Sequence, residues 1–204
     1  MTSSSERIVH IVDDDTDFRQ SLARLLEAAG YTTTTFASGS AFLTVAPQLS
    51  EGCVLLDVQM PRMDGLAVLE AFRKQGVRLP VIVMTAHGNV ATAVRAMRSG
   101  AFEFVEKPFD DAPLLALIDN ALTHPGAFRH ESEVAQAIER VAALSPREHE
   151  VLAGLLAGRP NKTIAYDLNI SVRTVEVHRA RLMERLGLHT FAEVIRLGVL
   201  ASLR

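Results

Sequence analysis

Short apolar runs alternate with longer amphipathic segments throughout residues 7–122, and this alternation restricts the fold more than any other feature of the sequence. The pattern predicts strands near 7–12, 32–36, 53–57, 80–84 and 102–105, and helices near 16–29, 39–46, 64–75, 89–99 and 111–122. Parallel strands need long crossover connections, which are usually helices. We therefore predict a small α/β domain in which helices cover both faces of a doubly wound parallel sheet.

The second half of the chain predicts helices alone, near 146–157, 161–168, 172–186 and 191–201. The first of them begins at Ser145-Pro146-Arg147-Glu148, which combines a serine N-cap, a first-turn proline and a capping-box glutamate. A Thr-His-Pro-Gly break follows Leu122, and residues 127–143 have only a thin apolar stripe (Val134, Ile138, Val141), typical of a linker helix that packs on another element. The predicted organisation is an α/β domain over 1–123, a linker over 124–143 and an all-α four-helix domain over 144–204.

Composition excludes several classes of protein. The chain is 48% hydrophobic, yet it has no apolar run long enough to span a membrane and no signal-peptide pattern, so a cytoplasmic protein without a membrane partner is expected. Cys53 is the only cysteine, which excludes an internal disulfide framework and a thiolate zinc site. The net charge is −5 over residues 1–122 and +3 over residues 144–204, and this asymmetry indicates two separate tasks.

Polar groups of complementary chemistry follow four of the predicted strands. Asp13, Asp14 and Asp15 follow the first, Asp57 ends the third, Thr85 ends the fourth, and Lys107 comes just after the fifth. The carboxyl ends of parallel strands meet at one edge of the sheet, where carboxylates repel unless a cation such as Mg²⁺ neutralises them. The set suits phosphoryl transfer, with Asp57 as the nucleophile, Lys107 and the metal screening charge, and Thr85 donating to a phosphoryl oxygen.

Each of these residues also has an ordinary structural interpretation, such as a helix cap or a solvated loop lysine. Their joint occurrence at four strand ends favours the chemical one. A magnesium-dependent phosphohydrolase of the haloacid dehalogenase type is an alternative, because Asp13 and Asp15 fit its Asp-x-Asp motif. That alternative leaves Asp57 without a role and the helical half unexplained.

Residues 7–122 resemble the receiver domain of bacterial two-component response regulators, through Asp13-Asp14, the segment Leu55–Gly65 around Asp57, Thr85-Ala86-His87-Gly88 and Lys107-Pro108-Phe109. The resemblance implies five parallel strands in flavodoxin-like order and a switch protein, not an enzyme. It further implies the following roles: Asp57 as phosphoacceptor; Asp14, Asp57 and the Gln59 carbonyl as Mg²⁺ ligands; Asp13 as an acid of the pocket that orients the site through the waters of the metal; Thr85, Lys107 and Phe104 as phosphoryl-contacting or switch residues; Gln59 and His87 as residues that tune dephosphorylation.

Phosphorylation adds charge that would draw Thr85 toward the phosphoryl group and open space beside the fourth predicted strand. Phe104 could then rotate inward, which would alter the surface of residues 89–105. Val90, Val94, Met97 and Ala101 supply apolar material for a homodimer contact there, although each also suits an ordinary helix core.

The helical half resembles the helix-turn-helix domain of NarL/LuxR-type regulators, through Leu144–Glu148, Asn161–Ala165 and Arg173–His178. Periodicity places Val175, Leu182 and Leu186 inward, and the opposite face carries mixed charge, so the residues alone favour DNA binding and a solvated face equally. The resemblance implies that 172–186 enters the major groove. Lys162, Arg173, Thr174, His178 and Arg179 are then candidates for phosphate contacts, and Glu176, Val177 and Ala180 for base contacts. Leu188, Val194, Leu197 and Leu200 fit either a dimer contact or the domain's own core.

Receiver and helix-turn-helix together resemble the FixJ subfamily. The resemblance implies a transcriptional activator that a sensor histidine kinase phosphorylates on Asp57, and that then dimerises and binds promoter DNA, where RNA polymerase is a further expected partner. A DNA-binding protein that uses its receiver only as a dimerisation platform remains an alternative.

Overall fold

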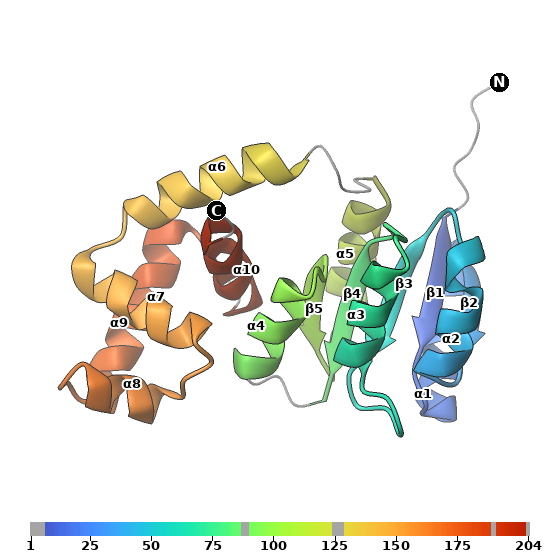
Figure 1. Ribbon diagram of the computed structural model, residues 1–204, viewed down its shortest axis with the longest axis horizontal. Helices are drawn as coiled ribbons and strands as arrows, with labels where there is room; N and C mark the ends of the chain where they lie inside the picture. Colours follow the sequence, from blue (N-terminus) through green and yellow to red (C-terminus); the bar gives the residue numbers. More distant parts are fainter. Residues whose placement is uncertain (1–6, 87–89, 124–128, 189–190, 203–204) are drawn as a thin grey trace. The chain divides into compact units, whose positions relative to one another are not determined.

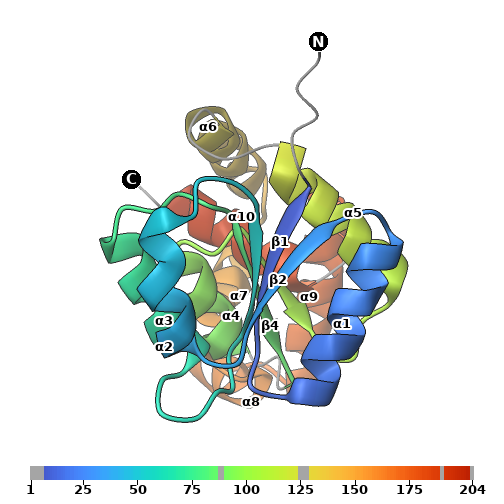
Figure 2. The same cartoon turned by 90° about the vertical axis from the view of Figure 1, so that its right-hand side faces the viewer.

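The computed structural model describes residues 7–86, 90–123, 129–188 and 191–202. Its first half contains a five-stranded parallel sheet in the order β2-β1-β3-β4-β5, as the resemblance implied (Figures 1 and 2). The strands are β1 Ile8–Val12, β2 Thr32–Phe36, β3 Cys53–Asp57, β4 Val81–Thr85 and β5 Glu103–Glu106. The order reverses direction between β1 and β3, and such a switch point is where open α/β sheets bind their ligands.

The pattern of burial follows from the position of each strand in the sheet. β3 and β4 are buried at every residue, because helices cover both faces of the centre of a parallel sheet. The edge strand β2 has the sequence Thr-Thr-Thr-Thr-Phe and is largely exposed or half-buried. The last two strands each begin one residue later than the sequence predicted, which is an ordinary displacement of an element boundary.

Helices flank the sheet on both faces. α1 Thr16–Ala28 and α5 Asp111–Thr123 lie on one face, and α2 Gly39–Val45 and α3 Gly65–Lys74 lie on the other, with the short 3₁₀ turn η1 Ala46–Gln48 after α2 (Figure 2). Leu22, Leu26, Leu114 and Ile118 from α1 and α5 form a core with alternate residues of β1, β3 and β4. This core fixes the strand ends that carry the polar side chains.

The second half is helical, with α6 Arg129–Ala142, α7 Pro146–Leu156, α8 Asn161–Asp167, α9 Val172–Leu186 and α10 Phe191–Ser202. Ala137 of the predicted linker helix α6 is buried in one core with residues of α7, α9 and α10. The linker helix therefore packs on the helices that follow it, as expected, although the buried residue is Ala137 and the stripe residues Ile138 and Val141 are half-buried. Val175, Leu182 and Leu186 of α9 are all buried, which confirms the predicted inward face.

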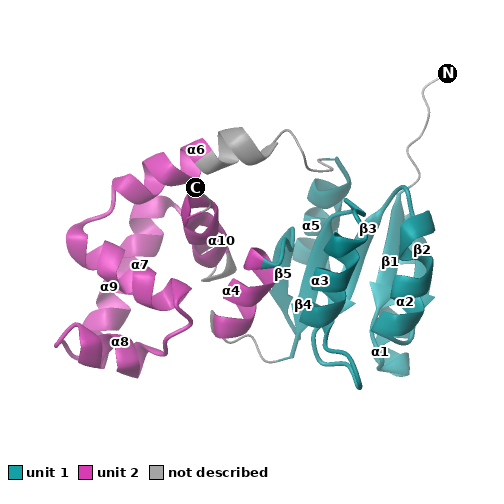
Figure 3. Ribbon diagram, in the orientation of Figure 1, with its two compact units in different colours: residues 1–87, 99–126 teal, residues 88–98, 127–204 magenta. Residues whose placement is uncertain are grey.

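The chain separates into two compact units, and their boundaries differ from those of the domains predicted from the sequence (Figure 3). The first comprises residues 1–87 and 99–126, and the second comprises 88–98 and 127–204. The helix α4 Val90–Arg98 thus belongs to the second unit, where it packs against α7 and α10. None of the described helices has both the length and the apolar character needed to cross a membrane.

The capping box at Ser145 holds the start of α7 as the sequence predicted. Ser145 Oγ accepts from the Glu148 backbone N–H, and Glu148 Oε2 accepts from the Ser145 backbone N–H at 2.8 Å. Arg185 of α9 also contacts Glu148 Oε2, at 3.2 Å. The bond from the Ser145 backbone N–H holds the pKa of Glu148 below its usual value.

We expect Glu148→Ala to lower the free energy of unfolding by about 1–3 kcal/mol, because it removes a cap and a charged partner of α9. The folded-state pKa of Glu148 is depressed, so its contribution is present above the unfolded pKa and is lost as the pH falls through the folded one. Thermal unfolding of the wild type and the variant at neutral and acidic pH measures both effects. Glu150→Ala is the matched control, because Glu150 makes only an exposed ion pair with Arg147, worth at most about 1 kcal/mol. An equal loss of unfolding free energy in Glu148→Ala and Glu150→Ala would contradict the stabilising role of the capping box.

Candidate functional site

Two buried carboxylates and one lysine meet at the carboxyl edge of the sheet. Asp13 directly follows β1, Asp57 is the last residue of the neighbouring β3, and their side chains are 1% and 6% exposed. Lys107, in the loop after β5, donates from Nζ to Asp13 Oδ2 and to Asp57 Oδ1, both at 2.7 Å. The structure therefore brings together three of the predicted site residues, from three separate strand ends.

The charges of this cluster do not balance. Burial raises the pKa of Asp13, and the bonds from Lys107 offset only part of the rise. Burial also acts to lower the pKa of Lys107, but its bonds to the two carboxylates outweigh burial and raise it, so the ammonium stays protonated at neutral pH. One ammonium thus faces two carboxylates, and an anion arriving at this edge needs further positive charge.

The Asp13 segment is held by a neighbouring backbone N–H and by the Arg19 side chain. Asp13 Oδ1 accepts from the Asp15 N–H at 2.9 Å, and the Asp13 carbonyl accepts from Arg19 at 2.6 Å. Asp15 is the N-cap of α1, since its Oδ1 accepts from the backbone N–H groups of Asp17 and Phe18. The cap gives the third acid of the triplet a structural role, which its place directly before a helix could have indicated.

Asp57 is positioned by a tight loop that ends at Gly65. The Gly65 N–H donates to the Val58 carbonyl at 2.9 Å, and Asp64 caps α3 by accepting from the Ala67 N–H. A Cβ on residue 65 would lie 2.0 Å from the Asp57 carbonyl oxygen, so only glycine fits this approach. Gln59 is exposed within the loop, and Asp14 is exposed beside the cluster.

Thr85 and Phe104 occupy the neighbouring strands. Strand register sets Asp57 opposite Met84, so the buried Thr85 lies one residue further along the same edge. The Lys107 N–H donates to the Thr85 carbonyl at 2.7 Å, which ties the lysine loop to β4. Phe104 is 8% exposed and pairs with Val83, so its side chain is buried here, and its inward rotation on phosphorylation stays a prediction. His87 lies outside the described residues.

The donor set is compatible with Mg²⁺. Within the residues that the structure describes, no three Asp, Glu, His or Cys side chains gather closely enough to enclose a metal. Mg²⁺ does not need such a group, because it retains several waters and takes only one or two carboxylates beside a phosphate. Two neighbouring strand-end carboxylates, with Asp14 and the Gln59 backbone nearby, are oxygen donors of that kind.

An aromatic pair beside Lys107 was not predicted. Phe18 of α1 lies with its ring centroid 3.9 Å from Lys107 Nζ, and Phe109 packs edge-on against Phe18 at 6.0 Å between centroids. The sequence offered only one hint, namely that Phe109 follows Lys107 by two residues. The contact between Phe18 and Lys107 joins residues that are 89 positions apart, so no local sequence pattern reveals it.

The candidate dimer residues are largely covered in this structure. Val94 and Ala101 are buried and Met97 is half-buried, whereas the side chain of Val90 lies outside the described part. Val194 and Leu197 of α10 are buried in the helical core, and Leu200 packs partly against it. Leu188 also packs partly against this core, but it follows the end of α9 and does not belong to the last helix, where the sequence placed it. For these four residues the structure supports the core interpretation.

Helices α8 and α9 form a helix-turn-helix. Asn169, at a positive φ of 53°, makes the turn between them, and Ser171 caps α9 by accepting from the Thr174 N–H at 3.0 Å. The left-handed Gly187 ends α9. These local signals explain why the predicted bounds of α9 agree with the structure.

The candidate DNA-contacting residues divide into two groups. Lys162, Arg173, Glu176, Val177 and Ala180 are exposed. Thr174, His178 and Arg179 are half-buried: Thr174 Oγ1 lies 2.7 Å from Ser171 Oγ, and Arg179 donates to Asn161 Oδ1 at 3.0 Å. Thr174 and Arg179 of the second group thus help to hold α9 in place, and the first group forms the accessible surface.

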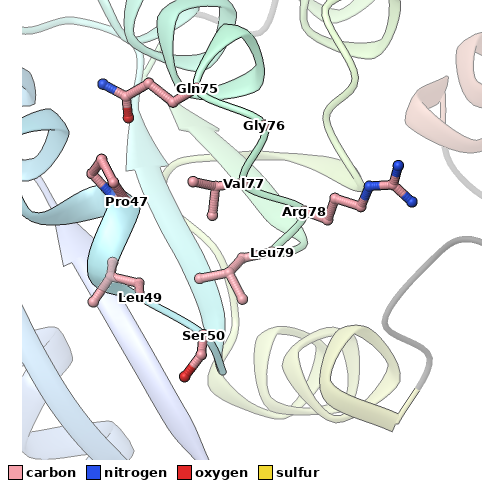
Figure 4. A pocket seen from close by; sticks show the side chains of 8 residues that line it. All are labelled: Pro47, Leu49, Ser50, Gln75, Gly76, Val77, Arg78 and Leu79. Carbon is pink, nitrogen blue, oxygen red and sulfur yellow. The ribbon is translucent and has the colours of Figure 1, made fainter.

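An open cavity of about 530 Å³ lies elsewhere in the first unit (Figure 4). Its lining residues, among them Leu49, Ser50, Arg78 and Leu79, precede β3 and β4, so it opens at the amino edge of the sheet. The cavity is therefore separate from the carboxylate cluster and contributes nothing to that site.

Comparison with known proteins gives two family matches. Residues 9–119 match the response regulator receiver domain, and residues 142–197 match the luxR family of bacterial regulatory proteins.

Similar proteins extend over nearly the whole chain. The transcriptional regulatory protein FixJ of Bradyrhizobium diazoefficiens is 43% identical over 96% of this chain and 96% of its own length. The tetrathionate response regulatory protein TtrR of Salmonella typhimurium is 40% identical over 92% of this chain and 90% of its own. The crystal structure of full-length FixJ from B. japonicum has a TM-score of 0.58 at 41% identity, and the match covers 98% of this chain and 100% of that one.

Proposed function

Because the chain belongs to the FixJ-type response regulators, which join a receiver domain to a luxR-type DNA-binding domain, we propose that phosphorylation of Asp57 switches this transcriptional regulator on. The observation that carries the proposal is the bonding of Lys107 to both Asp13 and Asp57 at the carboxyl edge of the sheet. A buried nucleophile with a fixed cation beside it is suited to accept an anionic group.

Phosphoryl transfer begins with a sensor histidine kinase as donor. An oxygen of Asp57 forms a bond to phosphorus as the phosphorus–nitrogen bond of the donor histidine breaks, and the imidazole keeps the electron pair. Lys107 moves its ammonium toward the incoming phosphoryl oxygens, and the Thr85 hydroxyl donates to one of them. Asp14, Asp57 and the Gln59 carbonyl, beside Asp13, would hold Mg²⁺, and the bound metal would supply the remaining positive charge. Gln59 and His87 are the residues that we propose tune the later hydrolysis of the phosphoryl group by water.

The rival phosphohydrolase interpretation loses its support. It needs Asp15 as a second catalytic carboxylate, but Asp15 Oδ1 caps α1 through the Asp17 and Phe18 N–H groups. The similar proteins are transcriptional regulators of the response regulator type.

The switch acts through α4. Within the second unit, α4 packs against α7 and α10, and a Cβ on Gly158 at the end of α7 would lie 3.1 Å from Ala91 Cβ (Figure 3). We infer that the unphosphorylated receiver and the linker occlude the helical domain. Phosphorylation then frees the surface of Val90, Val94, Met97 and Ala101 for a homodimer that binds promoter DNA and activates transcription with RNA polymerase.

Fluorescence anisotropy with labelled double-stranded promoter DNA tests this switch. Acetyl phosphate with Mg²⁺ is expected to tighten binding by the wild type at least about tenfold, since a dimer reads two half-sites, and to leave Asp57→Asn unchanged. Equal affinities for wild type and Asp57→Asn, each with and without acetyl phosphate and Mg²⁺, would mean that phosphorylation of the receiver does not control DNA binding. That result would favour the alternative in which the receiver is only a dimerisation platform.

The exposed residues of α9 are expected to divide into phosphate and base contacts. Arg173→Ala should weaken binding to specific and unrelated DNA alike and reduce the salt dependence by about one phosphate contact. Glu176→Gln should instead change the preferred base at one position, because the carboxylate accepts only from donors such as cytosine N4. Binding titrations over a salt series measure both effects. Arg24→Ala, which removes an exposed arginine of α1, is the charge-matched control.

A further inference from the structure

We propose that Phe18 is a positioning residue for phosphoryl transfer, because the face of its ring holds the ammonium of Lys107 in place between Asp13 and Asp57. The proposal deepens the proposed function and rests on it. It assigns a role to a side chain of α1 that lies outside the acidic triplet, the phosphoacceptor loop and the lysine loop. Three observations carry it, namely the partners of Lys107, the placement of Phe18 and the packing of Phe109.

The ammonium of Lys107 has two carboxylate partners and one aromatic neighbour. A lysine ammonium has three N–H donors and no acceptor. Two of them serve Asp13 Oδ2 and Asp57 Oδ1, each at 2.7 Å. The ring centroid of Phe18 lies 3.9 Å from the same nitrogen, well within the range of about 6 Å for a cation–π contact. The lysine side chain is only 15% exposed, so water competes weakly for its third donor.

The ring of Phe18 is itself fixed from two directions. The Phe18 backbone N–H donates to Asp15 Oδ1 at 3.1 Å, and this bond fixes the position of Phe18 as the third residue of α1. Its side chain packs edge-on against Phe109 at an interplanar angle of 74°, an arrangement favoured for aromatic pairs, and both rings pack against the sheet core. Because Phe109 follows Lys107 by two residues, the same loop supplies the cation and the ring that supports its aromatic partner.

A ring face suits a cation that must change partners. Hydrogen bonds to carboxylates fix an ammonium in direction, whereas attraction to a ring face tolerates small shifts of the cation. In the proposed transfer, Lys107 turns from Asp57 Oδ1 toward the incoming phosphoryl oxygens while Asp13 remains. The ring of Phe18 stays behind the ammonium through that shift and limits the orientations that it can adopt. Loss of the ring therefore lowers the fraction of molecules that are ready to accept the phosphoryl group.

Two substitutions separate the π face from apolar bulk. Phe18→Leu keeps an apolar side chain but has no ring, and Phe18→Tyr keeps the ring. We expect the rate of Asp57 phosphorylation by acetyl phosphate and Mg²⁺ to fall about fivefold in Phe18→Leu and to stay within about twofold of wild type in Phe18→Tyr, as a contact of about 1 kcal/mol implies. Thermal unfolding shows whether both variants remain folded, so that a rate is compared only between folded proteins.

A spectroscopic measurement reports on the contact without any phosphorylation. Lys74, Lys107 and Lys162 are the only lysines of the chain, so a sample labelled with ¹³C-lysine gives three sets of ε-methylene signals, which Lys74→Arg and Lys162→Arg assign. The signal of Lys107 should lie upfield of the other two because of the ring current. It should move toward them in Phe18→Leu and remain shifted in Phe18→Tyr.

These measurements distinguish failure of the positioning role of Phe18 from failure of the proposed function. A wild-type Lys107 signal without an upfield shift, or one that Phe18→Leu leaves in place, overturns the positioning role. Equal phosphorylation rates in wild type and Phe18→Leu, or equal losses in Phe18→Leu and Phe18→Tyr, overturn it as well. A wild type that shows the shifted signal but accepts no phosphoryl group contradicts the proposed function, and the geometry around Lys107 stands.

Discussion

Gly65→Ala is expected to abolish measurable phosphorylation of Asp57 and to lower the free energy of unfolding of the receiver by about 4 kcal/mol or more. The added Cβ would lie 2.0 Å from the Asp57 carbonyl oxygen and 2.9 Å from the Val58 Cα, and both are backbone atoms that no rotamer change can move aside. Relief requires the phosphoacceptor strand and its loop to separate, which breaks the bond from the Gly65 N–H to the Val58 carbonyl. Acetyl phosphate labelling followed by intact mass, together with urea unfolding, measures both losses.

Gly76→Ala is the control for this prediction. Gly76 has a positive φ of 76° at the end of α3, but a Cβ there would meet no atom within 4 Å. Backbone strain in Gly76→Ala should lower the free energy of unfolding by only about 1–2 kcal/mol, and phosphorylation of Asp57 should stay intact. Wild-type phosphorylation of Gly65→Ala would show that the loop does not need the close approach seen here.

Lys107→Met is expected to slow phosphorylation of Asp57 by about 10²–10³-fold, the usual cost of removing one preorganised charge-stabilising group. Methionine keeps an apolar stem but leaves Asp13 and Asp57 buried without their shared cation. Their mutual repulsion should make the folded variant bind divalent cations more tightly, so added Mg²⁺ should raise its melting temperature more than that of the wild type.

Stopped-flow or quenched labelling at saturating Mg²⁺ measures the rate, and thermal melts with and without Mg²⁺ measure the stabilisation. Lys74→Met removes an exposed lysine at the end of α3 and should change neither quantity. Phosphorylation of Lys107→Met at the wild-type rate would exclude the lysine from the transfer step.

The parallel sheet and its functional edge could be predicted because both follow from local signals. Apolar runs identified the central strands β1, β3 and β4, and the residue after each run necessarily lies at the carboxyl edge. Asp13, Asp57 and Lys107 therefore meet as expected, although they are separated by as many as 94 positions in the sequence. The capping box at Ser145 and the buried face of α9 were predictable for the same reason, since each depends on spacing within one helix.

Features that depend on packing between distant elements could not be predicted. The contact of Phe18 with Lys107 joins α1 to the loop after β5, and neither segment has a pattern that points to the other. The bond of Arg179 to Asn161 depends on the angle between α8 and α9, so a residue expected to face DNA is half-buried instead. The membership of α4 in the second unit likewise has no local signal, because its apolar residues suit either a sheet or a helical partner.

The most direct test of the account is the intact mass of the full chain after incubation with acetyl phosphate and Mg²⁺, for wild type and Asp57→Asn, with light scattering on the same samples. The account predicts one added phosphoryl group and a change from monomer to dimer in the wild type, with neither in the variant. An adduct that persists in Asp57→Asn, or a wild type that stays unmodified under these conditions and with a phosphorylated sensor kinase, would contradict it.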